Sequence, residues 1–215
     1  MKLWLDQTLE LQRQGQSCVL ITVAATRGSA PRATGTHMVV SVDQVFETIG
    51  GGNLEYQAIA KARSMLSQVD GPQHQLERYV LGADMGQCCG GLVYLHFAVL
   101  DDAFTVALKQ LKLVYEQKGS AALLVRYSSA QCDYDIIHAE SNNSESKLAQ
   151  CGFNQVGSIR DQLNNEQAHA QCLWFESQGQ WLAETLRDKE AQWSDYCLVH
   201  RLLPPRFRVV IFGAG

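Results

Sequence analysis

The first half of the chain alternates between continuous apolar runs and segments in which apolar positions have helical spacing. Residues 17–26, SCVLITVAAT, form an uninterrupted apolar run rich in β-branched side chains, which is typical of a strand buried on both faces. In residues 54–69 the apolar positions recur every three or four residues, as they do on one face of an α-helix. The pattern therefore predicts a buried strand and a helix that packs on a sheet.

Further segments of the same two kinds predict the remaining elements. We expect an amphipathic helix over residues 1–16 and a third helix over 101–118, closed by Gly119. Asn53 is the expected N-cap of the helix at 54–69. The other expected strands are residues 36–42, 74–82, 92–100, 121–127, 132–138, 170–177, 180–186 and 196–203, of which 121–127 with 132–138 and 170–177 with 180–186 are expected to form hairpins. Together the segments predict an α/β fold with a mixed or parallel central sheet and flanking helices.

The end of the chain has the pattern of the first strand of a second domain. A Pro-Pro pair is followed by residues 208–215, RVVIFGAG, which run from β-branched residues into Gly-Ala-Gly. A dinucleotide-binding βαβ unit begins in this way. We expect residues 1–203 to form one domain and residues 204–215 to be a linker and the first strand of an incomplete Rossmann-like domain. A bound dinucleotide is then expected only in a longer parent chain. The alternative is a frayed Gly-Ala-Gly tail.

Composition and charge argue against several classes of protein. With 22 acidic and 18 basic residues the chain has a formal net charge of -4, which gives no electrostatic basis for binding nucleic acid. No apolar run approaches the ~20 residues that a membrane-spanning helix needs. The seven cysteines are an odd number in a chain that is long enough to bury a core without disulfides. We therefore expect a cytoplasmic protein with free thiols that binds neither nucleic acid nor a membrane.

Three glycine-containing loops carry the candidate binding chemistry. They are residues 27–35 (RGSAPRATG), 49–55 (IGGGNLE) and 81–91 (LGADMGQCCGG). Each of them follows a predicted strand or precedes a predicted helix or strand. If neighbouring strands are parallel, the loops gather at one end of the sheet, where α/β folds bind their ligands.

The first two loops have features of a phosphate site. Glycines before a helix N-terminus expose backbone N–H groups, and the positive end of the helix dipole favours an anion. Arg27 and Arg32 flank a Ser-Ala-Pro turn and would add the bidentate charge that phosphate prefers. The alternative is a tight turn whose arginines pair with nearby carboxylates. The residues expected at the phosphate end of a ligand are Ser29, Arg32, Gly50, Gly51, Gly52 and Asn53.

The third loop contains two adjacent cysteines, Cys88 and Cys89, between Gln87 and the pair Gly90 and Gly91. Glycines give access to the sulfur atoms and supply N–H donors that can lower the pKa of a thiol. Zinc fits poorly, because the pair lacks the Cys-x₂-Cys spacing and no second Cys/His cluster follows at the usual interval. A thiolate for a soft metal or a sulfur-containing cofactor fits better. A nucleophilic Cys–His pair stays open as an alternative, with the candidate bases His37, His74 and His96.

The remaining cysteines are given no role in function. Three of them lie within or beside apolar runs, as buried structural cysteines do, namely Cys18, Cys172 and Cys197. Cys132 and Cys151 have polar neighbours and are expected to be surface thiols.

The segments GSAPRATGTHMVV, TIGGGNLE and GQCCGG, in this order and followed by VVIFGAG after a Pro-rich link, resemble the XdhC/CoxI family. The resemblance covers roughly residues 10–100 and the terminal strand. Members of this family are accessory factors in the maturation of xanthine dehydrogenase and related molybdenum hydroxylases, and they are expected to continue into a complete Rossmann-like domain. The resemblance implies a chaperone, and not an enzyme, that transiently binds the molybdenum cofactor, a pyranopterin dithiolene with a terminal phosphate.

The resemblance also implies partners and ligand contacts. A cysteine desulfurase would provide sulfur for the cofactor, and xanthine dehydrogenase or a related molybdenum hydroxylase would receive it. Cys89, in the Cys-Gly-Gly element, is the family's candidate contact to the metal, with Cys88 as its neighbour. We expect a homodimer, because the unpaired apolar strand near the end of the chain needs a partner. The alternatives are a nicotinamide-dependent oxidoreductase, suggested by FGAG, and a redox-sensing module whose vicinal thiols form a disulfide.

Overall fold

The three predicted helices are present in the protein. The computed structural model describes residues 4–82, 90–127, 132–137, 173–175, 180–181 and 196–202 of the 215-residue chain. Within these ranges the helices are α1 (Trp4–Arg13), α2 (Gly52–Ser67) and α3 (Asp102–Lys118). No helix in the described part of the chain is long and apolar enough to cross a membrane.

The first sheet is built around β1. Its strand order is β3-β2-β1-β5-β4, and all four pairings are antiparallel. The strands are β1 (Cys18–Arg27), β2 (His37–Ser41), β3 (Val45–Glu47), β4 (His74–Val80) and β5 (Leu92–Val99). The α/β class is confirmed, but the described strands are not parallel. The reason is that β1 and β2, β2 and β3, and β4 and β5 are joined by loops shorter than the dozen or so residues of a crossover.

A second sheet follows α3, where the sequence predicted one central sheet. Its strand order is β7-β6-β10-β8-β9, and its pairings are again antiparallel. The strands are β6 (Ala121–Tyr127), β7 (Cys132–Ile137), β8 (Leu173–Phe175), β9 (Gln180–Trp181) and β10 (Tyr196–Leu202). Both predicted hairpins, β6–β7 and β8–β9, are confirmed. The predicted linker and Rossmann-like strand, residues 204–215, lie outside the described residues.

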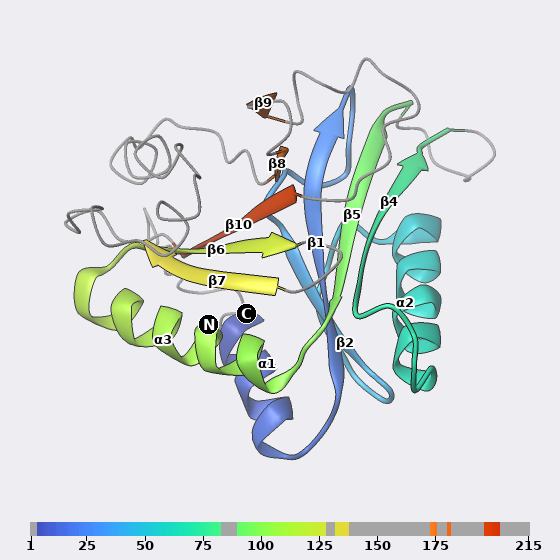
Figure 1. The fold of residues 1–215 in the computed structure, drawn as a ribbon. Coiled ribbons are helices and arrows are strands. Elements are labelled where there is room, and N and C mark those ends of the chain that lie inside the picture. Colours follow the sequence, from blue (N-terminus) through green and yellow to red (C-terminus); the bar gives the residue numbers. More distant parts are fainter. Residues whose placement is uncertain are drawn as a thin grey trace, which may run out of the picture.

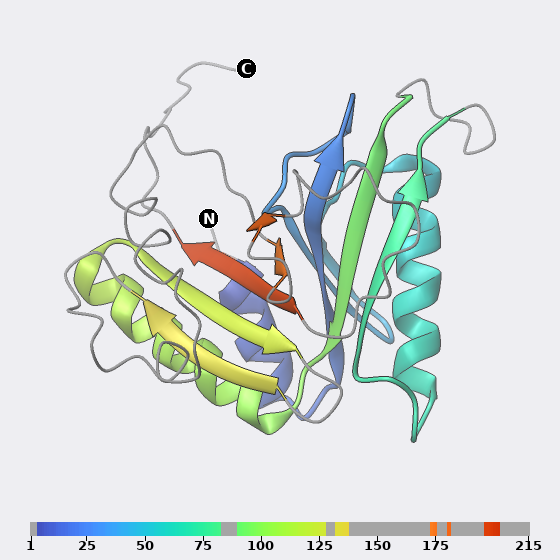
Figure 2. The same cartoon turned by 45° about the horizontal axis from the view of Figure 1, so that its top comes forward.

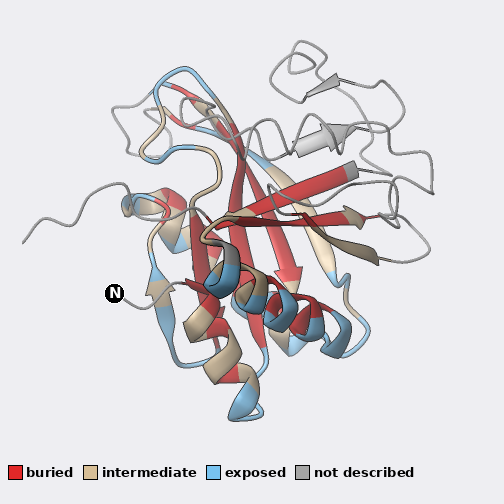
Figure 3. Ribbon diagram, turned by 90° about the vertical axis from the view of Figure 1, so that its left-hand side faces the viewer, coloured by how far each residue is buried: buried red, intermediate tan, exposed pale blue. Residues whose placement is uncertain are grey.

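The two sheets and the helices form a layered core. α2 covers one face of the first sheet, and the second sheet lies on the opposite side with α1 and α3 packed beneath it (Figure 1, Figure 2). Val19 and Ile21 of β1 pack with α2, whereas Leu20 belongs to the cluster that includes α1, α3 and the second sheet. This burial on both faces explains the unbroken apolar run of β1. Figure 3 shows the buried residues concentrated along the strands.

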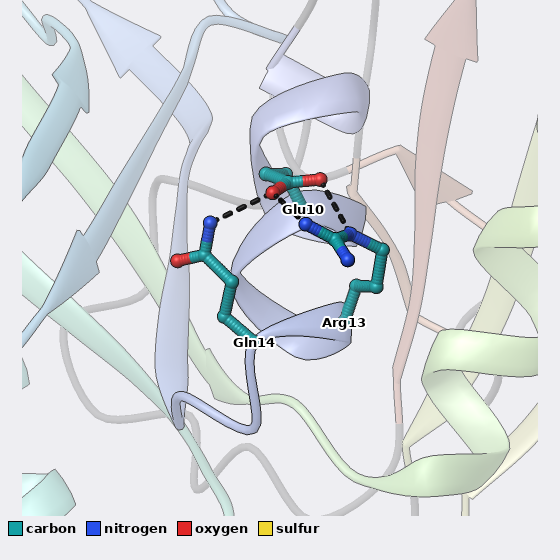
Figure 4. A network of polar contacts seen from close by, with 3 residues as sticks. All are labelled: Glu10, Arg13 and Gln14. Atoms are coloured by element: carbon teal, nitrogen blue, oxygen red, sulfur yellow. Dashed lines mark hydrogen bonds and ion pairs between the residues drawn. The ribbon is translucent and has the colours of Figure 1, made fainter.

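Helix α1 is attached to α3 by a part-buried ion pair. Lys112 Nζ of α3 lies 2.5 Å from Asp6 Oδ1 of α1. On its solvent-exposed side, α1 carries a second polar network in which Glu10 accepts hydrogen bonds from Arg13 and Gln14 (Figure 4). Because this second network is exposed to water, it contributes little to stability.

Three histidines lie in the core between the two sheets. His37 Nε2 of β2 and His200 Nδ1 of β10 are 3.0 Å apart, so this contact joins the first sheet to the second. Trp4 of α1 stacks on His37 with ring centroids 4.2 Å apart, and His96 of β5 lies 4.5 Å from Tyr127 of β6. Burial lowers the pKa of all three histidines, that of His200 to about 3. At neutral pH their rings are therefore uncharged.

Mild acid is expected to destabilise the protein through these histidines. Each has a folded-state pKa below the unfolded value of about 6.5, so their contribution is complete above that pH and is lost as the unfolded state takes up protons below it. With three such residues the free energy of unfolding should fall by up to about 4 kcal/mol per pH unit between roughly pH 6.5 and pH 5. Denaturant unfolding at a series of pH values measures this slope.

A matched pair of variants tests the assignment. His200→Gln removes one titrating ring and should reduce the slope by about 1.4 kcal/mol per pH unit. Lys109→Gln, at an exposed position of α3, should leave the slope as it is. An unchanged slope in His200→Gln would contradict the assignment.

Candidate ligand site at the glycine loops

The loop after β1 touches both of the other glycine loops. Gly91 packs so closely against it that a Cβ atom on Gly91 would overlap the Ser29 carbonyl and lie 2.9 Å from the Arg27 carbonyl oxygen. On the other side, a Cβ atom on Gly50 would overlap the Pro31 ring. Only glycine permits backbones to approach this closely. The three loops therefore meet at one place.

The three glycine loops lie at the same end of the first sheet although its strands are antiparallel. β1 and β4 end, and β2 and β5 begin, at the same end of the first sheet, and α2 begins there as well (Figure 1). In an antiparallel sheet, the connections of alternate strand pairs lie at the same end. The β1–β2 and β4–β5 connections are therefore neighbours, because β1 and β5 are paired.

Arg27, the last residue of β1, is exposed to solvent, and so are Ser29 and Arg32 of the loop that follows it. Within the described ranges, neither arginine forms an ion pair with a carboxylate. The alternative in which these arginines are neutralised by nearby acids is therefore not found there. Guanidinium groups bind anionic ligands such as phosphate in a bidentate manner.

The Glu55 carboxylate organises the turn before α2. Its Oε2 atom accepts hydrogen bonds from the Thr48 hydroxyl at 2.5 Å, the Ile49 N–H at 3.1 Å and the Gly51 N–H at 3.0 Å. The Gly50 N–H in turn donates to the Thr48 hydroxyl at 3.0 Å. An acidic side chain in the first turn is also favoured by the positive end of the helix dipole.

This turn changes two expectations for the start of α2. The N-cap residue is Gly51, with φ of 75°, and not Asn53, because Glu55 supplies the acceptor that an Asn N-cap would have provided. Of the backbone N–H groups expected to bind phosphate, those of Gly50 and Gly51 already donate to side chains of the protein. The groups that α2 leaves for a ligand are those of Gly52 and Asn53.

The cysteine loop is described at its two ends. A hydrogen bond of 2.8 Å from the Leu81 N–H to the Gly91 carbonyl closes the link between β4 and β5. Gly90 is exposed and has open space around it, in contrast to Gly91. The predicted ligand residues that lie outside the described residues are Gln87, Cys88 and Cys89. Their roles stay predictions.

Each of the histidines proposed as alternative bases contacts a side chain of the second sheet. His37 and His96 are in the core between the sheets, and His74 contacts Tyr127 of β6 with ring centroids 4.7 Å apart. In the described part of the chain, no group of three or more His, Cys, Asp or Glu residues could hold a metal ion.

The cysteines described outside this loop are structural. Cys18 and Cys197 are buried, as predicted. Burial raises the pKa of Cys18 to about 11. Cys132 is half-buried, and not the surface thiol that its polar neighbours predicted, and burial raises its pKa to about 11 as well. Both thiols are therefore protonated at neutral pH and poorly reactive. Two further cysteines, Cys151 and Cys172, lie outside the described residues.

Two residues beside the first loop were not found from the sequence, Arg78 of β4 and Tyr94 of β5. They lie directly opposite each other in the antiparallel pairing, and the Arg78 side chain donates a hydrogen bond to the Tyr94 hydroxyl. The register of the β4–β5 hairpin is the signal that would have placed these two residues opposite each other. The sequence predicted these strands without their pairing, so the two side chains were not brought together.

The fold and the loops define an α/β protein of two antiparallel sheets with a candidate ligand site at one end of the first sheet. Residues 11–80 match the model of the XdhC and CoxI family, which confirms the resemblance for the first two of the four sequence motifs. The match spans β1 to β4 and the first two glycine loops. No curated protein matches the chain.

The chain is also similar to a solved structure, that of a xanthine dehydrogenase from Bacillus halodurans, with a TM-score of 0.55 and 19% sequence identity. The likeness covers 92% of this chain and 52% of that one, so this chain spans about half of its length. At this level of identity the likeness concerns the fold.

The close approach of Gly91 to the first loop gives a testable prediction. Gly91→Ala should destabilise the protein by about 1–3 kcal/mol, the usual cost of forcing extra atoms into a packed site, because its methyl group overlaps the Ser29 carbonyl. Gly90→Ala is the matched control and should stay within about 0.5 kcal/mol of the parent, since open space surrounds Gly90. Equal free energies of unfolding for the two variants would show that the loops do not meet at Gly91.

Proposed function

We propose that this protein is an accessory factor in the maturation of xanthine dehydrogenase or a related molybdenum hydroxylase. The observation that carries the proposal is the contact between the glycine loops. The first two belong to the segment that matches the XdhC and CoxI family, and the third packs on the first through Gly91. An exposed site formed by three loops, with arginines that form no ion pair with an acid of the described residues, suits the binding and release of an anionic small molecule.

The proposed cargo is the molybdenum cofactor, a pyranopterin dithiolene with a terminal phosphate. It carries a soft metal bound by sulfur at one end and a phosphate at the other. Cys89 directly precedes Gly90 in the sequence, and its thiolate is the proposed contact to the metal end, since soft thiolates bind soft metals. Cys88 and Gln87 are the proposed neighbours of this contact.

The proposed role is that of a chaperone and not of an enzyme. The protein would hold the cofactor while a cysteine desulfurase provides the sulfur that converts it to the sulfurated form. It would then deliver the cofactor to the apo-form of the molybdenum hydroxylase, acting in the cytoplasm as a homodimer. Release requires only moderate affinity, which fits an exposed site better than an enclosed one.

The cysteines provide the direct test of this function. Cys89→Ser replaces a soft thiolate by a hard, mostly protonated hydroxyl and should abolish cofactor retention while leaving thermal stability nearly unchanged. Binding is measured by absorbance during titration of the purified protein with molybdenum cofactor, and delivery by reactivation of apo-xanthine dehydrogenase. Affinity in the parent protein should also fall as the pH drops below the thiol pKa, because the metal binds the deprotonated sulfur.

Cys88→Ser and Cys132→Ser are the comparison variants. Side chains of adjacent residues in an extended segment point to opposite sides, so Cys88→Ser should retain more cofactor than Cys89→Ser. Cys132→Ser changes a half-buried thiol of the second sheet and should bind like the parent protein. If the Cys88/Cys89 double variant retains cofactor as the parent does, the thiols are structural and the proposed contact is wrong.

A further inference from the structure

Three strands place charged and polar side chains on one face of the first sheet, beside the glycine loops. Arg78 of β4 lies directly opposite Tyr94 of β5, and Tyr94 lies opposite Ala25 of β1. Arg27 is two residues beyond Ala25, so its side chain is on the same face as that of Tyr94. Side chains directly opposite each other in an antiparallel pair are neighbours, and diagonal ones lie within reach of long side chains.

Arg78 and Arg27 both influence the phenol group of Tyr94. The Arg78 side chain donates a hydrogen bond to the Tyr94 hydroxyl. Burial raises the pKa of Tyr94, and the positive charges of Arg78 and Arg27 act in the opposite direction. The strand register therefore places both arginines on the face of the sheet that carries the Tyr94 side chain, and Tyr94 as a whole residue is only 5% exposed.

No acid of the described residues neutralises this pair. Glu77, next to Arg78 in the sequence, faces the opposite side of the sheet, where its carboxylate lies 2.6 Å from Lys61 Nζ of α2 and accepts a hydrogen bond from the Tyr79 hydroxyl. Within the described ranges, neither Arg27 nor Arg78 has an ion pair. Two like charges held near each other repel, and an anion bound between them removes that cost.

The position of the pair suits a ligand at the loop site. A Cβ atom on Gly91 would lie 2.9 Å from the Arg27 carbonyl oxygen, so Arg27 directly borders the base of the cysteine loop. Both arginine side chains are exposed, whereas the Tyr94 ring below them is buried. Guanidinium groups bind phosphate in a bidentate manner, and a hydroxyl adds a further donor.

We propose that Arg27, Arg78 and the Tyr94 hydroxyl form the binding site for the phosphate group of the ligand. The proposal rests on the proposed function for the identity of the ligand, and it moves the phosphate away from the start of α2. There the Glu55 carboxylate accepts the Gly51 N–H hydrogen bond and repels a second anion. A phosphomonoester is the ligand class recognised, and Arg32 is not part of this phosphate site.

Phosphate binding by single variants tests the proposal. Inorganic phosphate is titrated into the purified protein at low ionic strength and followed by calorimetry, with the fold checked by circular dichroism. Arg78→Gln and Arg27→Gln should each weaken binding by about tenfold or more, the usual effect of losing a hydrogen bond to a charged group. Tyr94→Phe keeps the ring and should weaken binding less. Arg63→Gln, at an exposed position of α2, is the matched control and should bind like the parent.

The same titration with Arg32→Gln shows whether phosphate binds at Arg27 and Arg78 or at the start of α2. Phosphate affinity that is unchanged in Arg32→Gln and lost in Arg78→Gln supports the proposal. The reverse result places the phosphate at the start of α2 and overturns it. No phosphate binding by the parent protein, or equal losses in Arg78→Gln and Arg63→Gln, also overturns it.

Titration with molybdenum cofactor distinguishes failure of this inference from failure of the proposed function. If the parent protein binds phosphate through Arg27 and Arg78 but does not bind the cofactor, the proposed function is wrong and the phosphate site stands. If the parent binds the cofactor and both arginine variants bind it equally well, the function stands and the phosphate site is wrong.

Discussion

Burial of β1 on both faces is the constraint on which the rest of the structure depends. One face of the strand packs on α2, and the other faces the core that contains the second sheet. Because β1 is the central strand, it also fixes β2 on one side and β5 on the other. The end of β1 then determines where the loop after it begins, and this loop touches both Gly50 and Gly91. The core and the candidate site are thus positioned by one strand.

The core between the sheets is unusually polar for a structural layer. His37, Thr22 and His96 lie side by side across three strands of the first sheet, and His200 meets His37 from the second sheet. The Thr22 hydroxyl is buried without a hydrogen-bond partner among the described residues. Buried polar groups of this kind cost free energy unless they are paired. The His37–His200 contact recovers part of that cost and joins the two sheets.

Much of the fold could be predicted from the sequence, because its signals are local. The apolar run of β1, the helical spacing of α2 and the glycine after α3 each depend on a few neighbouring residues. Strand direction and pairing depend on contacts between distant residues, so the parallel alternative was wrong and the second sheet was missed. Asn53 was assigned as an N-cap because it is a preferred residue type, whereas Glu55 reaches back to the Gly51 N–H from the first turn.

The candidate site could also be predicted only in part, namely where its signals are local in the sequence. Its glycines are visible as motifs, and their packing on the first loop explains why glycine occurs there. Arg78 and Tyr94 belong to no motif, since only the β4–β5 register places them opposite each other. Of the three histidines that are candidate bases in the sequence, His37 and His96 belong to the core between the sheets. Side chains that act together across strands are invisible until the register is known.

At the loop end of the first sheet, side chains of opposite charge lie at the two faces of the sheet. On the α2 side, the start of the helix would ordinarily attract an anion, but Glu55 places a carboxylate there and uses the Gly51 N–H. On the opposite face, Arg27 and Arg78 lie near the Tyr94 hydroxyl. The proposed phosphate site therefore gives a ligand with one anionic end a single orientation, with that end toward the second sheet. Because Gly91 adjoins both Ser29 and Arg27, the remainder of a ligand bound at the proposed phosphate site would lie beside the base of the cysteine loop, where the soft thiolate contact is proposed.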